Sequence, residues 1–241
     1  MRRVLVTGGA SGIGAATVRR FQEDGCRVAA LDVDEAALGA CSADVKMVCD
    51  VADEQSVQSA VERAVTELGG VDVVVAAAGI ASRGSVMDCT PAEFGRVMSV
   101  NVRGVYLTCR ATLPHLRAAG GGAVVVVASQ LGLVAVADAA AYCASKGAVI
   151  NLTRAMALDH GPEGIRVNCV CPGPTETPLV ERFFADTADP TATRQAFEAA
   201  GVIGRLIEPA EIAEAIHYLA SERAKATIGA ALVVDAGYSV R

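Results

Sequence analysis

Short apolar, β-branched runs alternate with longer alanine-rich segments along the chain, and this alternation is its dominant pattern. The runs have the length and composition of buried strands, and the segments between them have helical spacing. Such alternation predicts βαβ units and a doubly wound parallel α/β sheet with helices on both faces, here of about seven strands. The expected strands are 3–7, 27–31, 45–49, 72–76, 123–128, 166–170 and 230–234.

Local signals predict helix starts and the organisation of the chain. Thr-Pro-Ala-Glu at 90–93 has the pattern of an N-cap, a first-turn proline and a capping-box glutamate, and Glu-Pro-Ala-Glu at 208–211 places a proline and acids in a first turn. No repeat or linker interrupts the alternation, so we predict a single domain over 1–241. Residues 174–204 depart from the alternation, and we expect them to form a mobile lid over the substrate.

Composition and charge argue against several classes of function. Apolar residues make up 52% of the chain and charged residues 20%, which favours a globular protein over a disordered one. The net charge of −6 gives no electrostatic attraction to nucleic acid or an anionic membrane, so we predict neither partner. Residues 118–137 lack charge over about the length of a membrane helix, but glycines interrupt them, and their valine-rich centre is typical of a buried strand.

The cysteines, histidines and N-terminus add three expectations. The eight cysteines include no C-x-x-C pair and the three histidines lie far apart, so we predict free thiols and no metal. Only Val-Leu-Val separates the N-terminal arginines from a Thr-Gly-Gly turn, which is too short for the apolar region of a signal peptide. We therefore expect a cytoplasmic protein.

A glycine-rich turn, TGGASGIG at 7–14, joins the first expected strand to a helical segment. In such a turn, backbone N–H groups and a helix N-terminus can approach a pyrophosphate where a Cβ would block it. The spacing is G-x-x-x-G-x-G and not the common G-x-G-x-x-G, so an ordinary tight turn is the alternative. Together with the sheet pattern, the turn predicts a Rossmann-type fold, with cofactor contacts from Gly8, Ser11, Gly12, Ile13 and Gly14.

A carboxylate at the end of the second expected strand bears on the choice of nucleotide. Asp32 follows Gly14 by nearly the ~20 residues expected for the acid that binds the adenosine ribose hydroxyls. No basic residue occurs over 28–45, so a ribose 2′-phosphate would meet only carboxylates, a contact that costs several kcal/mol. We therefore predict NAD as the cofactor; a solvated loop acid or a helix cap is the alternative for Asp32.

Tyr142 and Lys146 form a Tyr-x-x-x-Lys sequence with both side chains on one helix face. Tyr and Lys are rare enough in this chain that about 0.05 such matches are expected by chance. Ser129 follows the expected 123–128 strand, at the edge where open α/β sheets bind ligands. A phenol must lose about three pKa units to act as a base near neutral pH, and a nearby ammonium with the positive nicotinamide ring favours this.

These motifs together resemble the short-chain dehydrogenase/reductase family. The glycine-rich turn, Ser129, Tyr142, Lys146 and the Pro172-Gly173 pair carry the resemblance, which spans nearly the whole chain. It implies that Tyr142 is the general acid or base and that Ser129 orients the substrate oxygen. It also implies that Lys146 holds the nicotinamide ribose and lowers the pKa of Tyr142.

The resemblance also implies further site residues. Asn101, in the sequence SVNVRG, matches a family asparagine that holds a water linking the lysine to solvent. The family usually has Asn-Asn-Ala-Gly after the fourth strand, whereas this chain has Ala-Ala-Ala-Gly at 76–79. The further cofactor contacts expected from the resemblance are Asp50, Val51, Ala77, Gly79, Tyr142, Lys146, Pro172, Gly173, Thr175 and Thr177.

We therefore predict an oxidoreductase that transfers a hydride between NAD and a secondary alcohol or ketone. The segments 80–84 and 130–138 and the lid, with its arginines, admit a small polar, cyclic or anionic substrate. A 3-oxoacyl-carrier-protein reductase-like enzyme and a non-catalytic NAD-binding sensor are the alternatives. The resemblance also implies a homodimer or homotetramer through the helices around 104–117 and 142–160.

Overall fold

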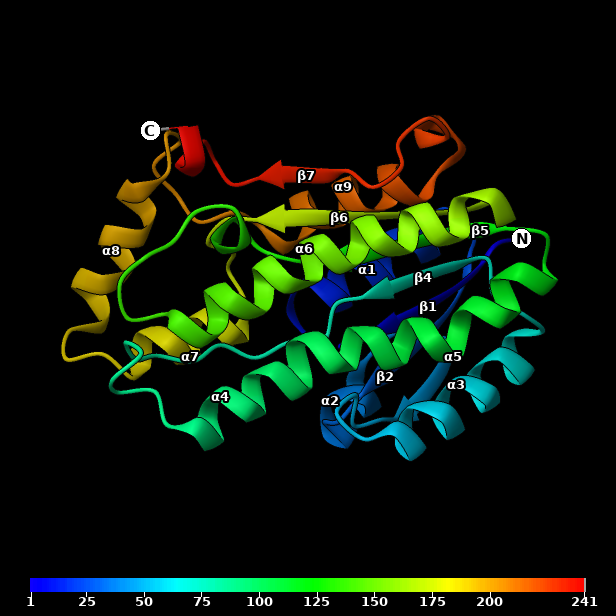
Figure 1. The fold of residues 1–241 in the computed structure, drawn as a ribbon, viewed down its shortest axis with the longest axis horizontal. Helices are drawn as coiled ribbons and strands as arrows, with labels where there is room; N and C mark the ends of the chain where they lie inside the picture. Colours follow the sequence, from blue (N-terminus) through cyan, green and yellow to red (C-terminus); the bar gives the residue numbers. More distant parts are fainter. Residues whose placement is uncertain (241) are drawn as a thin grey trace.

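A parallel seven-stranded sheet forms the centre of the protein in a computed structural model that describes residues 1–240 (Figure 1). The strand order is β3-β2-β1-β4-β5-β6-β7, so the connection from β3 to β4 crosses over β2 and β1. The predicted doubly wound sheet is therefore confirmed. Its strands are β1 (Arg3–Thr7), β2 (Arg27–Asp32), β3 (Val45–Val48), β4 (Val73–Ala76), β5 (Gly122–Val127), β6 (Ile165–Pro172) and β7 (Ala231–Val234).

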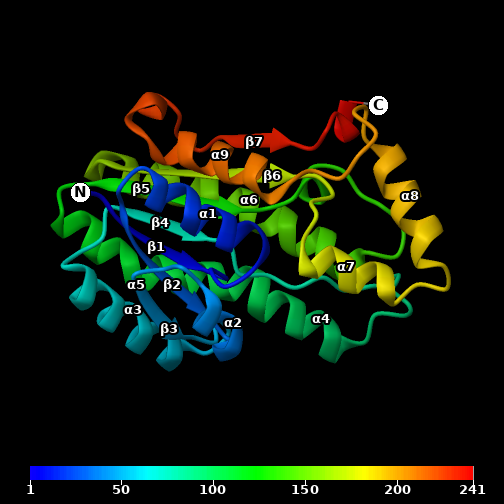
Figure 2. The ribbon, with the colours of Figure 1, turned by 180° about the vertical axis from the view of Figure 1, so that it is seen from behind.

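Helices cover both faces of this sheet and close a separate apolar core on each (Figures 1 and 2). In β4, Val74 packs into one core, while Val73 and Val75 pack into the other, because successive strand residues point to opposite faces. This explains the unbroken apolar runs in the sequence. One face carries α3 (Glu54–Leu68), α5 (Gly104–Ala118) and α6 (Ala140–His160); the other carries α1 (Gly12–Glu23), α2 (Glu35–Ala40) and α9 (Pro209–Ala220).

Glycine sets the start of β5, one residue earlier than the sequence predicted. Gly120, Gly121 and Gly122 have φ angles of 84°, 127° and 156°, which L side chains rarely adopt. A Cβ on Gly122 would lie 2.6 Å from the carbonyl oxygen of Asp72. The uncharged stretch around these glycines is thus a turn and a buried strand, and none of the described helices is long and apolar enough to cross a membrane.

Helix starts follow the predicted caps with one difference, at α4 (Pro91–Met98). The Thr90 hydroxyl accepts a 3.1 Å hydrogen bond from the Glu93 N–H, as an N-cap should. The Glu93 carboxylate, however, binds the guanidinium of Arg96 with both oxygens at 2.8 Å. The predicted capping box is therefore only half formed at α4, whereas at α9 Glu211 accepts the N–H of Glu208 at 2.8 Å.

Two short helices, α7 (Pro178–Ala185) and α8 (Pro190–Ala200), form the segment predicted as a lid. They lie beyond the carboxyl ends of β6 and β7 (Figure 1). Thr177 and Asp189 cap them by accepting hydrogen bonds from the backbone N–H groups three residues later, at Val180 and Ala192. Phe184 packs edge-on to Phe197 with ring centroids 5.2 Å apart, which joins the two helices.

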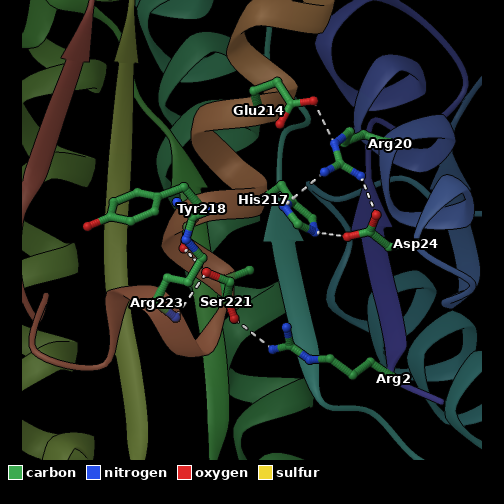
Figure 3. Close-up of polar contacts among 9 residues, drawn as sticks. Arg2, Arg20, Asp24, Glu214, His217, Tyr218, Ser221 and Arg223 are labelled. Carbon is green, nitrogen blue, oxygen red and sulfur yellow. Dashed lines mark hydrogen bonds and ion pairs between the residues drawn. The ribbon is translucent and has the colours of Figure 1, made fainter.

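A polar cluster joins α1 to α9, helices from opposite ends of the chain (Figure 3). Arg20 lies between two carboxylates, with 2.6 Å to Glu214 and 2.8 Å to Asp24. The Nε2 atom of His217 lies 2.7 Å from Asp24, and its ring contacts Phe21. The cluster therefore links α1, the helix after the glycine-rich turn, to the helix that precedes the last strand.

Candidate active site

The turn between β1 and α1 can be built only with glycine at its key positions. Gly8 and Gly12 have φ angles of 66° and 51°. A Cβ on Gly14 would lie 2.0 Å from the carbonyl oxygen of Gly8, and one on Gly8 would lie 2.7 Å from the backbone of Ala78. The backbone of the turn therefore comes close to α1 and to the chain just after β4, and pyrophosphate binding by this turn stays a prediction.

A cavity of about 440 Å³ opens at the carboxyl ends of β1 and β4, where the strand order reverses. Open α/β sheets bind their ligands at this point. The structure brings every predicted cofactor contact into the lining of this one cavity; that these residues bind a nucleotide stays a prediction. They are Gly8, Ser11, Gly12, Ile13, Gly14, Asp32, Asp50, Val51, Ala77, Gly79, Tyr142, Lys146, Pro172, Gly173, Thr175 and Thr177.

The Asp32 carboxylate is fixed by backbone donors at the end of β2. It accepts hydrogen bonds from the N–H of Ala10 and the N–H of Asp34, both at 3.1 Å. Asp34 and Asp50 also line the cavity, so three carboxylate side chains contribute to its wall. The basic residues in the same lining are Lys146 and Arg182, the latter from α7. The structure thus gives Asp32 a fixed orientation toward whatever the cavity holds.

Ser129 and Tyr142 line both this cavity and a second one of about 560 Å³ beneath the lid. Ser129 follows β5, and its Oγ accepts a 3.1 Å hydrogen bond from the N–H of Leu131. Tyr142 lies in the first turn of α6. The two hydroxyl-bearing side chains therefore lie where the contents of the two cavities meet.

Lys146 lies one helical turn after Tyr142 and is buried. Its Nζ donates a 3.0 Å hydrogen bond to the carbonyl oxygen of Val127 and lies 5.6 Å from the centroid of the Tyr142 ring. Desolvation lowers the pKa of Lys146 to about 8. The predicted Tyr–Lys pair is thus brought together, with an ammonium that is easily deprotonated.

Protein groups alone act on the Tyr142 phenol in the direction opposite to that expected from the sequence. Burial raises its pKa, because the phenolate loses more hydration than the phenol, and the neighbouring Ser129 hydroxyl opposes this only in part. The sequence predicted that Lys146 lowers this pKa. Since the lysine is itself buried and easily deprotonated, a lower phenol pKa requires a further positive charge, such as an oxidised nicotinamide.

Asn101 lies behind the first cavity, in a π-helical turn (Ser99–Arg103) between α4 and α5. Its Nδ2 donates to the carbonyl oxygen of Ile80 at 2.9 Å and to the Oγ of Ser145 at 3.0 Å, and its Oδ1 accepts the N–H of Ile80 at 2.8 Å. Such π-helical turns are frequent at functional sites. Asn101 thus ties α6 to the chain after β4, and its predicted water-holding role stays a prediction.

The sequence left open whether the lid arginines Arg182 and Arg194 contact the substrate or are solvated, and neither lines the second cavity. Arg194 binds three carboxylates of the lid region, at 2.5–3.0 Å, and lines neither cavity. Arg182 lines the first cavity and not the second. Arg83 does line the second cavity, but its guanidinium lies 3.9 Å above the Phe183 ring and donates to the carbonyl oxygen of Phe183.

Sequence reasoning missed part of the second cavity's lining. The expected segments 80–84 and 130–138 and the lid all contribute to it. Tyr238 also lines it, from the short helical turn after β7, and no local signal in the sequence marked this residue. All eight cysteines are free, and among residues 1–240 no group of three or more His, Cys, Asp or Glu side chains is placed to hold a metal ion.

The sheet, the glycine turn and the paired cavities define a Rossmann-type enzyme with a nucleotide cofactor. A family model described as enoyl-(acyl carrier protein) reductase matches residues 8–239. The protein belongs to the short-chain dehydrogenase/reductase family of oxidoreductases.

Known relatives match this chain over nearly its whole length. It is 43% identical over 246 residues to the cis-4-hydroxycyclohexanecarboxylate dehydrogenase of Sinomonas cyclohexanicum, covering 99% of this chain and 96% of that one. Levodione reductase has a similar structure, with a TM-score of 0.96 at 33% identity over 99% and 98% of the two chains. A 3-ketoacyl-(acyl-carrier-protein) reductase from Brucella melitensis complexed with NADH has a TM-score of 0.91 at 34% identity, over 99% and 98%.

Proposed function

We propose that the protein is an NAD-dependent dehydrogenase that interconverts a small secondary alcohol and the corresponding ketone. One observation carries the proposal: Ser129 and Tyr142 belong to the lining of both cavities. A nucleotide in the first cavity and an alcohol in the second then meet at these two hydroxyl groups. The names of the cis-4-hydroxycyclohexanecarboxylate dehydrogenase and levodione reductase relatives support a secondary alcohol or ketone as the substrate.

The chain's own residues handle the proton and the orientation of the substrate, while the nucleotide supplies the hydride chemistry when bound. The Oγ of Ser129 accepts from Leu131 and keeps one O–H donor, which can turn from the Tyr142 oxygen to the substrate oxygen. The Tyr142 phenolate takes the alcohol proton during oxidation, and the Tyr142 phenol gives a proton to the ketone oxygen during reduction. Lys146 stands on the same helix face, where its ammonium favours the phenolate together with the positive charge that an oxidised nicotinamide would add.

The proposal specifies NAD and not NADP because of the charges at the end of β2. The Asp32 carboxylate suits ribose hydroxyls, which donate hydrogen bonds to it, and repels a 2′-phosphate. Asp34 and Asp50 add further negative charge to the same lining. The NADH complex of the Brucella melitensis relative supports this choice.

A panel of secondary alcohols and cyclic diols, assayed for NADH formation with NAD and with NADP, tests the proposal. Tyr142→Phe removes the proton-transferring oxygen and should lower kcat by a factor of about 10³ or more, while NADH still binds. Tyr218→Phe, at a partly exposed tyrosine of α9, is the matched control and should retain full activity. Undiminished turnover in Tyr142→Phe would refute the proposed chemistry.

A further inference from the structure

Arg83, on the chain between β4 and α4, contacts the end of the lid helix α7. Its guanidinium lies 3.9 Å above the centroid of the Phe183 ring, and its Nη2 donates a 3.2 Å hydrogen bond to the carbonyl oxygen of Phe183. Both residues line the second cavity, and their two segments pass beside each other (Figures 1 and 2). One side chain therefore joins two walls of this cavity that are 100 residues apart in the sequence.

The hydrogen bond from Arg83 satisfies a carbonyl group that α7 leaves without a partner. The last four carbonyl groups of an α-helix have no acceptor role inside the helix. Backbone N–H groups after α7 bind the carbonyl oxygens of Arg182 and Phe184, whereas that of Phe183 accepts from Arg83. A cation at this position also faces the negative end of the helix dipole. Arg83 therefore stabilises the end of α7 from a different part of the fold.

The Phe183 ring extends this contact to the second lid helix. Its centroid lies 5.5 Å from that of Phe197 in α8, and Phe197 also lines the second cavity. The face of an aromatic ring attracts a cation placed above it. Arg83, Phe183 and Phe197 thus form a continuous row of contacts from the chain after β4 to α8.

Hydrogen bonds fix the backbone on either side of Arg83. The N–H and the carbonyl oxygen of Ile80 both bind the carboxamide of Asn101, at 2.8 Å and 2.9 Å. The N–H of Gly84 donates to the carbonyl oxygen of Asp138 at 2.9 Å. In α8, by contrast, none of the residues is buried. The lid helices therefore depend on side-chain contacts with a fixed neighbour for their position over the cavity.

We propose that Arg83 is a positioning residue that holds the end of α7 closed over the second cavity. Phe183 lines this cavity and not the first, so the contact acts on the alcohol and not on the nucleotide. The closing of the cavity over an alcohol rests on the proposed dehydrogenase function, and the contact with Arg83 describes how that cavity is kept shut.

Arg83→Met tests the inference, because it removes the guanidinium and keeps a long side chain. The substrate is the neutral alcohol of the panel with the highest kcat/KM. Its KM should rise about tenfold, since both contacts with α7 are lost, while kcat and the KM for NAD should change by less than about twofold. A lower kcat with an unchanged KM for the alcohol would indicate a loss of folded protein and would overturn the inference.

Two further arginine variants serve as a rescue and a control. Arg83→Lys keeps a cation above the ring and a donor for the carbonyl oxygen, so the KM for the alcohol should rise by no more than about threefold. Arg63→Met, at an exposed arginine of α3, makes the same exchange away from both cavities and should leave this KM unchanged.

A double variant distinguishes an action through Phe183 from direct binding of the substrate by Arg83. Phe183→Leu removes the ring that the guanidinium covers. In this background Arg83→Met should raise the KM for the alcohol by only about threefold or less, because half of the contact is already lost. An equal factor in both backgrounds would assign the effect to a direct contact with the alcohol, against the inference.

Limited proteolysis of the protein without ligands separates the inference from the proposed function. Arg83→Met should be cleaved several times faster than the wild type within 174–204, and Arg63→Met at the wild-type rate. Equal cleavage of Arg83→Met and the wild type would show that Arg83 does not hold α7, whatever the enzyme oxidises. If no alcohol of the panel is oxidised with NAD or NADP, the proposed function is wrong, and faster cleavage of Arg83→Met would still support the contact.

Discussion

The ammonium group of Lys146 donates a 3.0 Å hydrogen bond to the carbonyl oxygen of Val127, at the carboxyl end of β5. The lysine is only 5% exposed, and burial lowers its pKa from 10.5 to about 8. Between these two pH values the unfolded chain binds the proton and the folded chain releases it. The cost of the buried charge is therefore fully present below pH 8 and disappears as the pH rises toward 10.5.

We predict that Lys146→Met raises the free energy of unfolding at pH 7 by roughly 3 kcal/mol, since it removes this buried charge. The gain should shrink as the pH rises from 8 toward 10.5, and catalysis should be lost. Guanidinium unfolding at pH 7 and at pH 10 measures the difference. Lys46→Met, at an exposed lysine, should give no gain, and a Lys146→Met variant less stable than the wild type at pH 7 would contradict this account.

Asp32→Ser should change the choice of nucleotide. Removing the carboxylate removes both the acceptor for the ribose hydroxyls and a repulsion of several kcal/mol toward a 2′-phosphate. We expect the ratio of kcat/KM for NADP to that for NAD to rise by about 10²-fold. Steady-state kinetics with each nucleotide measures this ratio, and Asp159→Ser, at an exposed position of α6, should leave it unchanged. A ratio unchanged by Asp32→Ser would show that Asp32 does not select the nucleotide.

Gly14→Ala and Gly39→Ala should have opposite effects on stability. A Cβ at Gly14 meets the carbonyl oxygen of Gly8 at 2.0 Å, so the turn must distort, at a cost of several kcal/mol, and nucleotide binding should be lost. A Cβ at Gly39, inside α2, meets nothing within 4 Å and should stabilise the protein by about 0.5–1 kcal/mol. Thermal unfolding and NADH titration of the two variants check both outcomes; a Gly14→Ala protein that binds NADH normally would refute the first.

The sheet and the cavity at its carboxyl edge were predictable from patterns in the sequence. Apolar runs such as 123–128 fix buried strands, and the carboxyl ends of neighbouring parallel strands meet at one edge, so residues far apart in sequence come together there. The glycine-rich turn needs residues without a Cβ atom at fixed positions, and the spacing of its glycines shows this in the sequence. Both signals are local, and the topology of the parallel sheet then brings these distant residues to one edge.

Other features depend on long-range placement that no local pattern reveals. The contact of Arg83 with Phe183 joins segments 100 residues apart, and the direction of the Tyr142 pKa shift follows from burial. The sequence left open whether Arg194, in the lid segment, contacts the substrate or is solvated. In the structure it binds three lid-region carboxylates, whose positions depend on how α7 and α8 pack.

Arg194→Leu should loosen the lid. Its guanidinium joins Glu176, Glu181 and Glu198, so the substitution releases ion pairs that hold α7 and α8 together. These pairs are partly exposed and each contributes about 0–1 kcal/mol, so global stability should change little. Limited proteolysis should cleave the variant several times faster within 174–204. Arg110→Leu breaks a single surface ion pair with Glu54 and should leave this cleavage rate unchanged. Equal cleavage rates in wild type and Arg194→Leu would show that Arg194 does not hold α7 and α8 together.

Leu179 and Val180 of α7 belong to the lining of both cavities, so one short helix covers two ligands. Thr177, immediately before α7, also approaches the glycine turn, where a Cβ on Gly12 would lie 3.1 Å from its methyl group. A nucleotide bound against that turn would complete the wall of the cavity in which the alcohol binds. Turnover should then follow a compulsory sequence, with the dinucleotide entering first and leaving last, and product-inhibition patterns would display that sequence directly.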